Sequence, residues 1–232
     1  SASVYVSPDR VAINTPEPDA RPADGLNIRM PDPPLGQEQR LAKKIAAAKA
    51  FAKANDIDKT VFTPKKAKLG IITSGKSFKD VMQAFEDLGL TQKEAEKLGI
   101  RVYKVGMVWP LEPTGIHAFA EGLDEILVVE EKREIIENQL KELLYGQAKP
   151  PRIVGKADEQ GNALLPFAGG HSPGMVALAV AGRIGKVCPH KGVAAKAADI
   201  HRQEEAAKKQ TDTVVRLPYY CAGCPHNTST QV

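Results

Sequence analysis

Apolar and polar residues follow two alternating patterns through the middle of the chain. Short apolar runs, typical of buried strands, are followed by segments whose apolar residues recur every three or four positions, as on one face of a helix. The apolar runs cover 69–73, 101–108, 125–130 and 152–154. The helical segments cover 77–88, 91–98, 113–119 and 132–145. This alternation predicts an α/β fold with three layers, in which helices cover both faces of a mostly parallel sheet.

The two ends of the chain have different patterns and divide it into three parts. Prolines punctuate the first 36 residues, which favours an extended arm over an independent core. A helix is expected next, over 36–55, and its apolar face consists of Leu41, Ile45, Ala48 and Phe51. Near the other end, Ser172 and Pro173 begin a helix, and a polar helix follows over 193–209. We therefore predict an arm plus one helix over 1–64, an α/β domain over 65–156, and a helical extension over 157–232.

Composition and charge exclude several classes of protein. Hydrophobic residues make up 42% of the chain and charged residues 26%, as in an ordinary globular protein. The net charge is only +4 and the lysines are spread along helices, so we expect no nucleic acid as a partner. No apolar run is long enough to span a membrane. Three cysteines, an odd number, argue against a disulfide framework and for a cytoplasmic protein.

Residues 70–77 match the Walker A phosphate-loop pattern letter for letter. In a phosphate loop the first glycine follows the strand, so that the next four residues form the loop. Here the expected strand extends through Ile72, which leaves only 73–76 for a loop. We therefore predict that the segment binds no nucleotide, that Gly75 permits a tight turn, and that Ser77 caps the following helix.

The most distinctive chemistry is a Cys-x-x-Cys pair, Cys221 and Cys224, followed by His226. Such a pair presents two thiolates to one metal ion or one iron–sulfur cluster, and the other ligands must come from elsewhere. Haem attachment requires a histidine directly after the second cysteine, and thioredoxin-like dithiols open a helix after an internal strand. Half of a zinc site and half of an iron–sulfur site are the interpretations that remain. A motif this close to Val232 suggests that the chain is a piece of a longer protein.

The remaining candidate residues have simple structural interpretations. Cys188 lies in a second Cys-Pro-His triplet and could join the pair in a zinc site, but a small buried hydrophobe after a helix is the simpler reading. Residues 130–133 combine a strand end with the first turn of a helix, and are a weak candidate contact site at the carboxyl edge of the sheet. We expect structural or solvated roles for three histidines, His117, His171 and His201. No catalytic residue is assigned.

Several segments, taken in order, resemble one known family. They are 69–77, 105–113, 127–133, 139–144, 154–156, 165–166 and 220–230. In this order they are similar to the long, fused indolepyruvate ferredoxin oxidoreductases of bacteria, which belong to the thiamine-diphosphate-dependent 2-oxoacid:ferredoxin oxidoreductases. The similarity covers nearly the whole chain, and the cysteine motif is its most specific part.

The resemblance implies that this chain is an internal fragment. Residues 65–156 would correspond to a transketolase C-terminal-like domain, and 157–232 would end at the start of a thiamine-diphosphate and iron–sulfur domain. Cys221 and Cys224 would be two of the four cysteine ligands of a 4Fe–4S cluster. The thiamine diphosphate site, its magnesium ion and the other cluster ligands would lie outside this chain, so no cofactor is expected in this piece alone.

The resemblance also implies an activity for the complete enzyme. It would decarboxylate an arylpyruvate such as indolepyruvate oxidatively to an acyl-CoA, and pass electrons to ferredoxin. Its partners would be ferredoxin, coenzyme A and other domains of the same polypeptide, in an expected homodimer without nucleic acid or membrane. This piece would be a scaffold and subunit-contact domain, inactive alone. The alternative is a non-catalytic binding module with a structural zinc site at Cys188, Cys221, Cys224 and a histidine.

Overall fold

A computed structural model of the chain describes residues 7, 9, 11–17, 23, 25–27, 30, 32–209, 220 and 223–229. Its centre is a five-stranded sheet with the order β1-β3-β2-β4-β5. The strands are β1 (Lys59–Phe62), β2 (Leu69–Ser74), β3 (Ile100–Val105), β4 (Glu125–Val129) and β5 (Arg152–Val154). The helices are α1 (Pro34–Ala54), α2 (Gly75–Asp87), α3 (Gln92–Lys97), α4 (Pro113–Ala120), α5 (Ile135–Leu144), α6 (Pro173–Val187), α7 (Lys191–Lys209) and α8 (His226–Ser229).

The sheet is mostly parallel, as the sequence predicts. The central strand β2 pairs in parallel with β3 on one side and with β4 on the other, and β5 adds in parallel to β4. Leu69 on β2 lies opposite both Ile100 on β3 and Glu125 on β4. The sequence did not indicate β1, which pairs with the edge of β3 in the antiparallel direction. Two of the four residues of β1, Lys59 and Thr60, are exposed, so the strand lacks the apolar run that marks the other strands, although Phe62 is buried.

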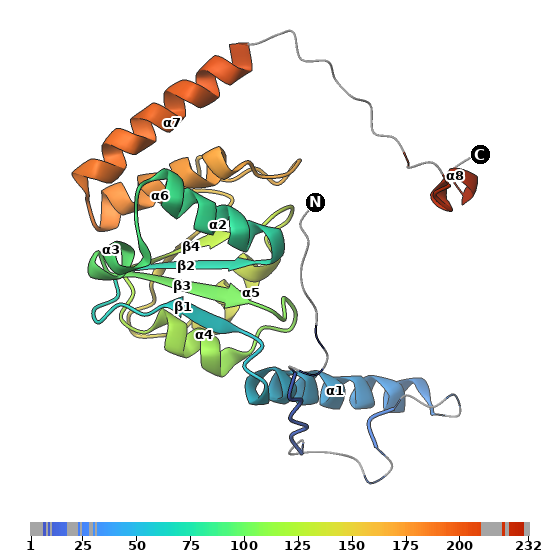
Figure 1. Cartoon of the computed structure of the whole chain (residues 1–232). Helices are drawn as coiled ribbons and strands as arrows, with labels where there is room; N and C mark the ends of the chain where they lie inside the picture. The colour runs from blue at the N-terminus through green and yellow to red at the C-terminus, as the bar shows by residue number, and fades with distance from the viewer. Residues whose placement is uncertain are drawn as a thin grey trace.

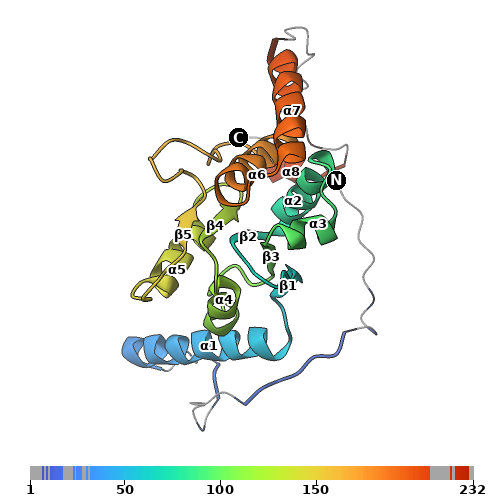
Figure 2. The ribbon, with the colours of Figure 1, turned by 90° about the vertical axis from the view of Figure 1, so that its left-hand side faces the viewer.

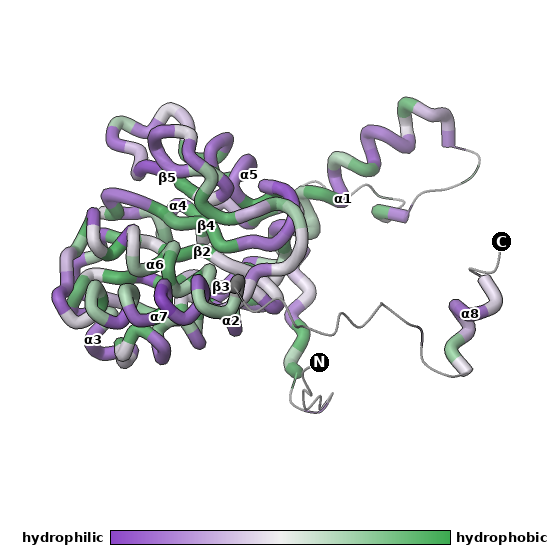
Figure 3. The backbone as a smooth tube through the Cα atoms, turned by 90° about the horizontal axis from the view of Figure 1, so that it is seen from above, coloured by the Kyte–Doolittle hydropathy of each residue, from purple (hydrophilic) through white to green (hydrophobic). Residues whose placement is uncertain are grey.

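Helices cover both faces of the sheet, and each face has its own hydrophobic core (Figures 1 and 2). Leu69 and Ile71 point to the face covered by α2, α3 and α6. The next residue, Ile72, points to the opposite face, which α4 and α5 cover. This division follows from the alternation of side chains along a strand. All five residues of β4 are buried, as expected for a strand covered on both faces. Figure 3 shows the hydrophobic strands enclosed by more hydrophilic helices and loops.

The capping signal predicted at α6 is confirmed, and the one predicted at α2 is wrong. At α3, Thr91 and Glu94 form a reciprocal capping box. The Ser172 hydroxyl accepts a hydrogen bond from the backbone N–H of Met175 at the start of α6. At α2, however, the residue before the helix is Ser74, and Ser77 is a buried residue of the helix instead of its cap. The helix begins earlier than the periodicity suggested because Gly75, at φ +52°, already starts the turn.

Helix α1 lies beside the α/β body and contacts it near its carboxyl end. Ala52 is buried there, and the Lys53 ammonium lies 3.4 Å from the Thr114 hydroxyl at the start of α4. The arm is joined to the same end, where the Asn14 backbone N–H donates to the Asn55 side-chain oxygen at 2.7 Å. Leu41, on the expected apolar face, is half exposed. Phe51 on the same face is also exposed, whereas Ile45 and Ala48 are partly buried.

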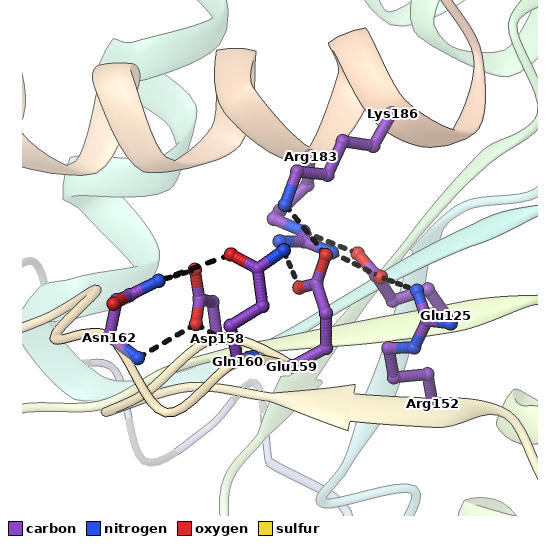
Figure 4. Close-up of polar contacts among 8 residues, drawn as sticks. All are labelled: Glu125, Arg152, Asp158, Glu159, Gln160, Asn162, Arg183 and Lys186. Carbon is purple, nitrogen blue, oxygen red and sulfur yellow. Dashed lines mark hydrogen bonds and ion pairs between the residues drawn. The ribbon is translucent and has the colours of Figure 1, made fainter.

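A buried ion pair joins α6 to the amino end of β4 (Figure 4). Arg183 on α6 has only 2% of its surface exposed, and its guanidinium donates two hydrogen bonds to the Glu125 carboxylate, through Nε and NH2. A third guanidinium nitrogen donates to Glu159 at 2.8 Å, and Lys186 binds the other oxygen of Glu159 at 2.6 Å. These carboxylates raise the pKa of Arg183, Glu125 most strongly. A guanidinium forms such a two-pronged contact because its donors are coplanar.

Removing one partner of this pair should destabilise the fold strongly. Arg183→Ala leaves the buried Glu125 with only its longer ion pair to Arg152, at 3.6 Å, and we expect it to lower the free energy of unfolding by about 3–5 kcal/mol, measured by urea denaturation. Lys186→Ala removes a partly exposed ion pair and should cost about 1 kcal/mol or less. Arg183→Met combined with Glu125→Leu should cost less than Arg183→Ala alone, because no charge is left buried. Equal costs for Arg183→Ala and Lys186→Ala would contradict this account.

Candidate functional site

The topology of the sheet points to the carboxyl ends of β2 and β4 as a place for function. The chain moves outward from β2 to β3, and then returns past β2 to form β4 and β5 on the other side. Open parallel sheets bind ligands at such a reversal, outside the carboxyl ends of the strands. Two segments singled out in the sequence meet at this edge: the last residues of the Walker-like segment, 75–77, after β2, and residues 130–133 after β4.

Lys76 connects these segments. Its ammonium lies 2.9 Å from a carboxylate oxygen of Asp80, 3.4 Å from one of Glu131, and donates to the backbone carbonyl of His171 at 2.6 Å. The hydrogen bond to Asp80, followed by the Glu131 interactions, raises the pKa of Lys76. The Lys76 ammonium therefore binds two carboxylates and a carbonyl of the same chain, whereas the lysine of a phosphate loop binds the phosphate of a ligand. The lysine joins the start of α2 to the loop that precedes α6.

The glycines of the Walker-like segment also have structural explanations. Gly70 lies inside β2, where a side-chain Cβ would come within 2.8 Å of Phe119 and 2.5 Å of Leu123. The glycine is therefore required by the close packing of α4 on the strand. Gly75 has no neighbour near its missing Cβ, but its positive φ suits a tight turn. Because Gly70 to Ser74 form a strand, the segment lacks the loop that would surround a phosphate.

Residues 130–133 form the loop between β4 and α5 instead of the expected first turn of a helix, because α5 begins only at Ile135. The Glu130 carboxylate accepts hydrogen bonds from the backbone N–H groups of Ile135, Ile136 and Glu137, at 2.9–3.1 Å, at the start of α5. Burial raises the pKa of Glu130, although these three donors oppose the shift. The Lys156 ammonium donates to the Glu130 backbone carbonyl at 2.5 Å. The arrangement satisfies the first turn of a helix and leaves Glu130 fully engaged.

The three histidines for which structural or solvated roles were expected lie at separate places. His171 is 3% exposed, and its Nε2 donates to the Pro166 carbonyl at 3.0 Å. The His117 ring lies 3.0 Å from the Gln147 amide, and His201 is exposed on α7. These positions agree with structural or solvated roles. None of the three forms an ion pair with a carboxylate in the described part of the chain.

The cysteine motif is described in part, because Cys221 lies outside the described residues. Cys224 is partly exposed, and its sulfur lies 3.3 Å from Nδ1 of His226. The rings of Tyr220 and His226 stack with their centres 5.6 Å apart. Gly223 has φ +78°, which lets the chain turn sharply just before Cys224. The sulfur is thus accessible on a turn and has an imidazole beside it.

Cys188 lies at the end of α6, in the core between α2 and α6, with 7% of its surface exposed. Burial raises the pKa of its thiol. Both features suit a small hydrophobic side chain, which was the simpler of the two expectations. Within residues 32–209 and the other described positions, no three His, Cys, Asp or Glu side chains come close enough to hold a metal ion.

Comparison with known families identifies the body of the chain. Residues 59–211, well over half of the sequence, match the indolepyruvate oxidoreductase domain. The chain belongs to the indolepyruvate oxidoreductase domain family. The matched region begins at β1 and contains the complete sheet. The resemblance drawn from the sequence motifs is thereby confirmed at the level of the family.

Curated relatives carry the same description. The indolepyruvate oxidoreductase subunit IorA of Methanothermobacter marburgensis is 27% identical over 229 residues, which are 95% of this chain and 32% of that protein. The subunit of the same name from Pyrococcus abyssi is 27% identical over 167 residues, 72% of this chain and 22% of that protein. The chain thus spans about a third or less of the length of these relatives.

Two solved structures show a more distant likeness. A 2-oxoglutarate:ferredoxin oxidoreductase from Magnetococcus marinus has a TM-score of 0.45 at 19% identity, over 66% of this chain and 24% of that chain. An inactive β4 tetramer of a split-gene transketolase has a TM-score of 0.37 at 16% identity, over 53% of this chain and 39% of that chain.

In the described part of this chain, no helix combines the length and apolar character needed to cross a bilayer.

Because Lys76 binds carboxylates and a carbonyl of its own domain, we predict that the Walker-like segment does not bind ATP. Titration of the chain with ATP and Mg²⁺ in a calorimeter should release no binding heat, because the strand occupies the residues of the loop. Lys76→Ala should give the same flat trace, as should Lys79→Ala, which changes an exposed lysine of the same helix. Micromolar binding that Lys76→Ala abolishes and Lys79→Ala preserves would show that the segment is a phosphate site.

Proposed function

We propose that this chain is part of an indolepyruvate-type 2-oxoacid:ferredoxin oxidoreductase, in which it is a scaffold and subunit-contact domain. The observation that carries the proposal is the family match over 59–211, which includes the whole sheet. The engaged state of the charged groups at the carboxyl edge supports a scaffold role, since Lys76 and Glu130 bind other parts of the same domain. In this proposal the division into 1–64, 65–156 and 157–232 follows the domains of the complete enzyme.

The second part of the proposal is that Cys221 and Cys224 ligate a 4Fe–4S cluster. The donor chemistry fits this group, because thiolates are the usual ligands of such clusters. The sulfur of Cys224 is accessible, and the backbone turn at Gly223 is compatible with two thiolates three residues apart facing one cluster. Two cysteines do not complete the ligand set, so the others would come from residues beyond this chain.

In this arrangement the chain's own residues hold and orient the cluster ligands. The Asn227 backbone N–H donates to the Cys224 carbonyl at 3.0 Å, and the Thr228 N–H donates to the Pro225 carbonyl at 3.2 Å. These bonds fix the turn on which the Cys224 side chain is placed. A 4Fe–4S cluster supplies one-electron transfer when it is bound, and the protein supplies its position and surroundings.

The complete enzyme would use thiamine diphosphate and magnesium bound outside this chain. It would convert an arylpyruvate such as indolepyruvate to an acyl-CoA, with coenzyme A as the acceptor of the acyl group and ferredoxin as the acceptor of electrons. The names of the curated relatives support this substrate class. We place the enzyme in the cytoplasm as a homodimer, where reducing conditions keep the thiols available as ligands.

Substitution of the cysteines tests the ligand assignment. In the complete enzyme, purified without oxygen, Cys221→Ser or Cys224→Ser should reduce the iron content by about one 4Fe–4S cluster and stop reduction of ferredoxin, because the cluster loses a thiolate. Cys188→Ser is the matched control and should keep full iron, since that thiol is in the core. Full iron and unchanged ferredoxin reduction in both motif variants would refute the assignment. Stoichiometric zinc in the 232-residue chain would favour the structural-zinc alternative.

A further inference from the structure

One contact near Cys224 is not used by the function proposed above. The Cys224 sulfur lies 3.3 Å from Nδ1 of His226, a distance suitable for a hydrogen bond to sulfur. The ring of Tyr220 stacks on the imidazole with an angle of 22° between the ring planes. The turn that carries both residues is closed by the hydrogen bond from Asn227 to the Cys224 carbonyl. The Tyr220 ring therefore supports one face of the imidazole, and the closed backbone turn keeps the imidazole close to the sulfur.

The direction of this hydrogen bond follows from the chemistry of the two groups. A thiolate that ligates a metal has no proton and can only accept, so Nδ1 must carry the proton and donate it. The neutral imidazole can do this with its proton on Nδ1. An Nδ1 that points at the sulfur cannot at the same time bind an iron of the same cluster. The geometry therefore favours His226 as a hydrogen-bond partner of the ligand Cys224, and not as a ligand of the iron itself.

We propose that His226 is a positioning residue whose Nδ1–H donates a hydrogen bond to the Cys224 thiolate and thereby raises the reduction potential of the cluster. This inference rests on the proposed function, because it requires Cys224 to be a ligand. Hydrogen bonds to the sulfur ligands are among the factors that set the potentials of iron–sulfur clusters. A donor at the sulfur withdraws negative charge, which stabilises the reduced and more negative form. Tyr220 keeps the ring in the orientation that the bond requires.

Two substitutions at His226 separate the hydrogen bond from the ring. His226→Phe keeps an aromatic ring to stack on Tyr220 but has no donor. His226→Asn has a shorter side chain with an amide N–H at a position close to that of Nδ1. The variants and the unchanged protein should be compared as complete, anaerobically purified enzyme, with iron and sulfide content measured first. The midpoint potential of the cluster is then measured by redox titration followed by electron paramagnetic resonance.

We expect full iron in both variants and a more negative midpoint potential in His226→Phe. A tenfold change in the equilibrium between oxidised and reduced cluster, equal to about 59 mV for a one-electron couple, is the expected size. His226→Asn should stay close to the unchanged protein. Electron–nuclear double resonance should detect an exchangeable proton coupled to the cluster, absent in His226→Phe and present in His226→Asn. This second measurement does not depend on catalytic turnover.

The results can also overturn the inference separately from the proposed function. An unchanged potential in His226→Phe with full iron means that His226 does not influence the cluster. Loss of iron in both His226 variants would make the histidine a ligand or a folding requirement, and would also exclude the positioning role. Retention of full iron in Cys224→Ser would refute the proposed function at this cysteine, and the inference would fail with it. Loss of the cluster in Cys224→Ser, together with a normal potential in His226→Phe, would overturn the inference alone.

Discussion

The ion pair between Arg183 and Glu125 is the contact on which the packing of this domain depends. Glu125 begins a strand that is buried on both faces, and an uncompensated charge there would be costly. Arg152 on β5 lies 3.6 Å from the Glu125 carboxylate, but the closer guanidinium comes from α6, a helix distant in sequence that lies beside α2 and completes one face of the sheet. The charge requirement and the hydrophobic contacts of α6 therefore specify the same position for the helix, and a shifted α6 would satisfy neither.

The two edges of the sheet use their charged groups in a similar way. At the amino edge, Glu159 and Lys186 extend the buried pair to the surface, and at the carboxyl edge Lys76 binds Asp80 and Glu131. Charged side chains at the reversal point of a parallel sheet commonly contact ligands. Here they contact neighbouring segments of the same domain, which stabilises the loops around the sheet. The residue pattern that best fits cofactor chemistry, the cysteine pair, lies instead beyond α7 in the sequence.

Periodicity was enough to predict the parallel strands and their helices, because each buries an apolar run or an apolar face. It did not indicate β1, a four-residue strand with exposed polar residues at its start and a single buried residue, Phe62, which pairs with β3. It also missed Arg183 as a buried partner of Glu125. A signal was present, since Arg183 interrupts an otherwise apolar stretch of α6 and Glu125 opens an apolar strand. Which acid such an arginine meets depends on the packing of distant segments, and no local pattern contains that information. The assignment of Cys221 and Cys224 stays a prediction.

The Walker-like segment shows that a sequence motif indicates a function only when its residues lie on the secondary structure that the function requires. Its first glycine is explained by the side chains of Phe119 and Leu123, and its last by a positive φ at the start of α2. Its lysine is half exposed and contacts two carboxylates and a carbonyl, which attract a cation and repel a phosphate. Three residues of the pattern thus have structural causes, which are packing at Gly70, a backbone turn at Gly75 and ion pairs at Lys76. The cysteine motif remains the candidate functional element, because a partly exposed thiol on a turn suits a ligand of a metal ion or an iron–sulfur cluster.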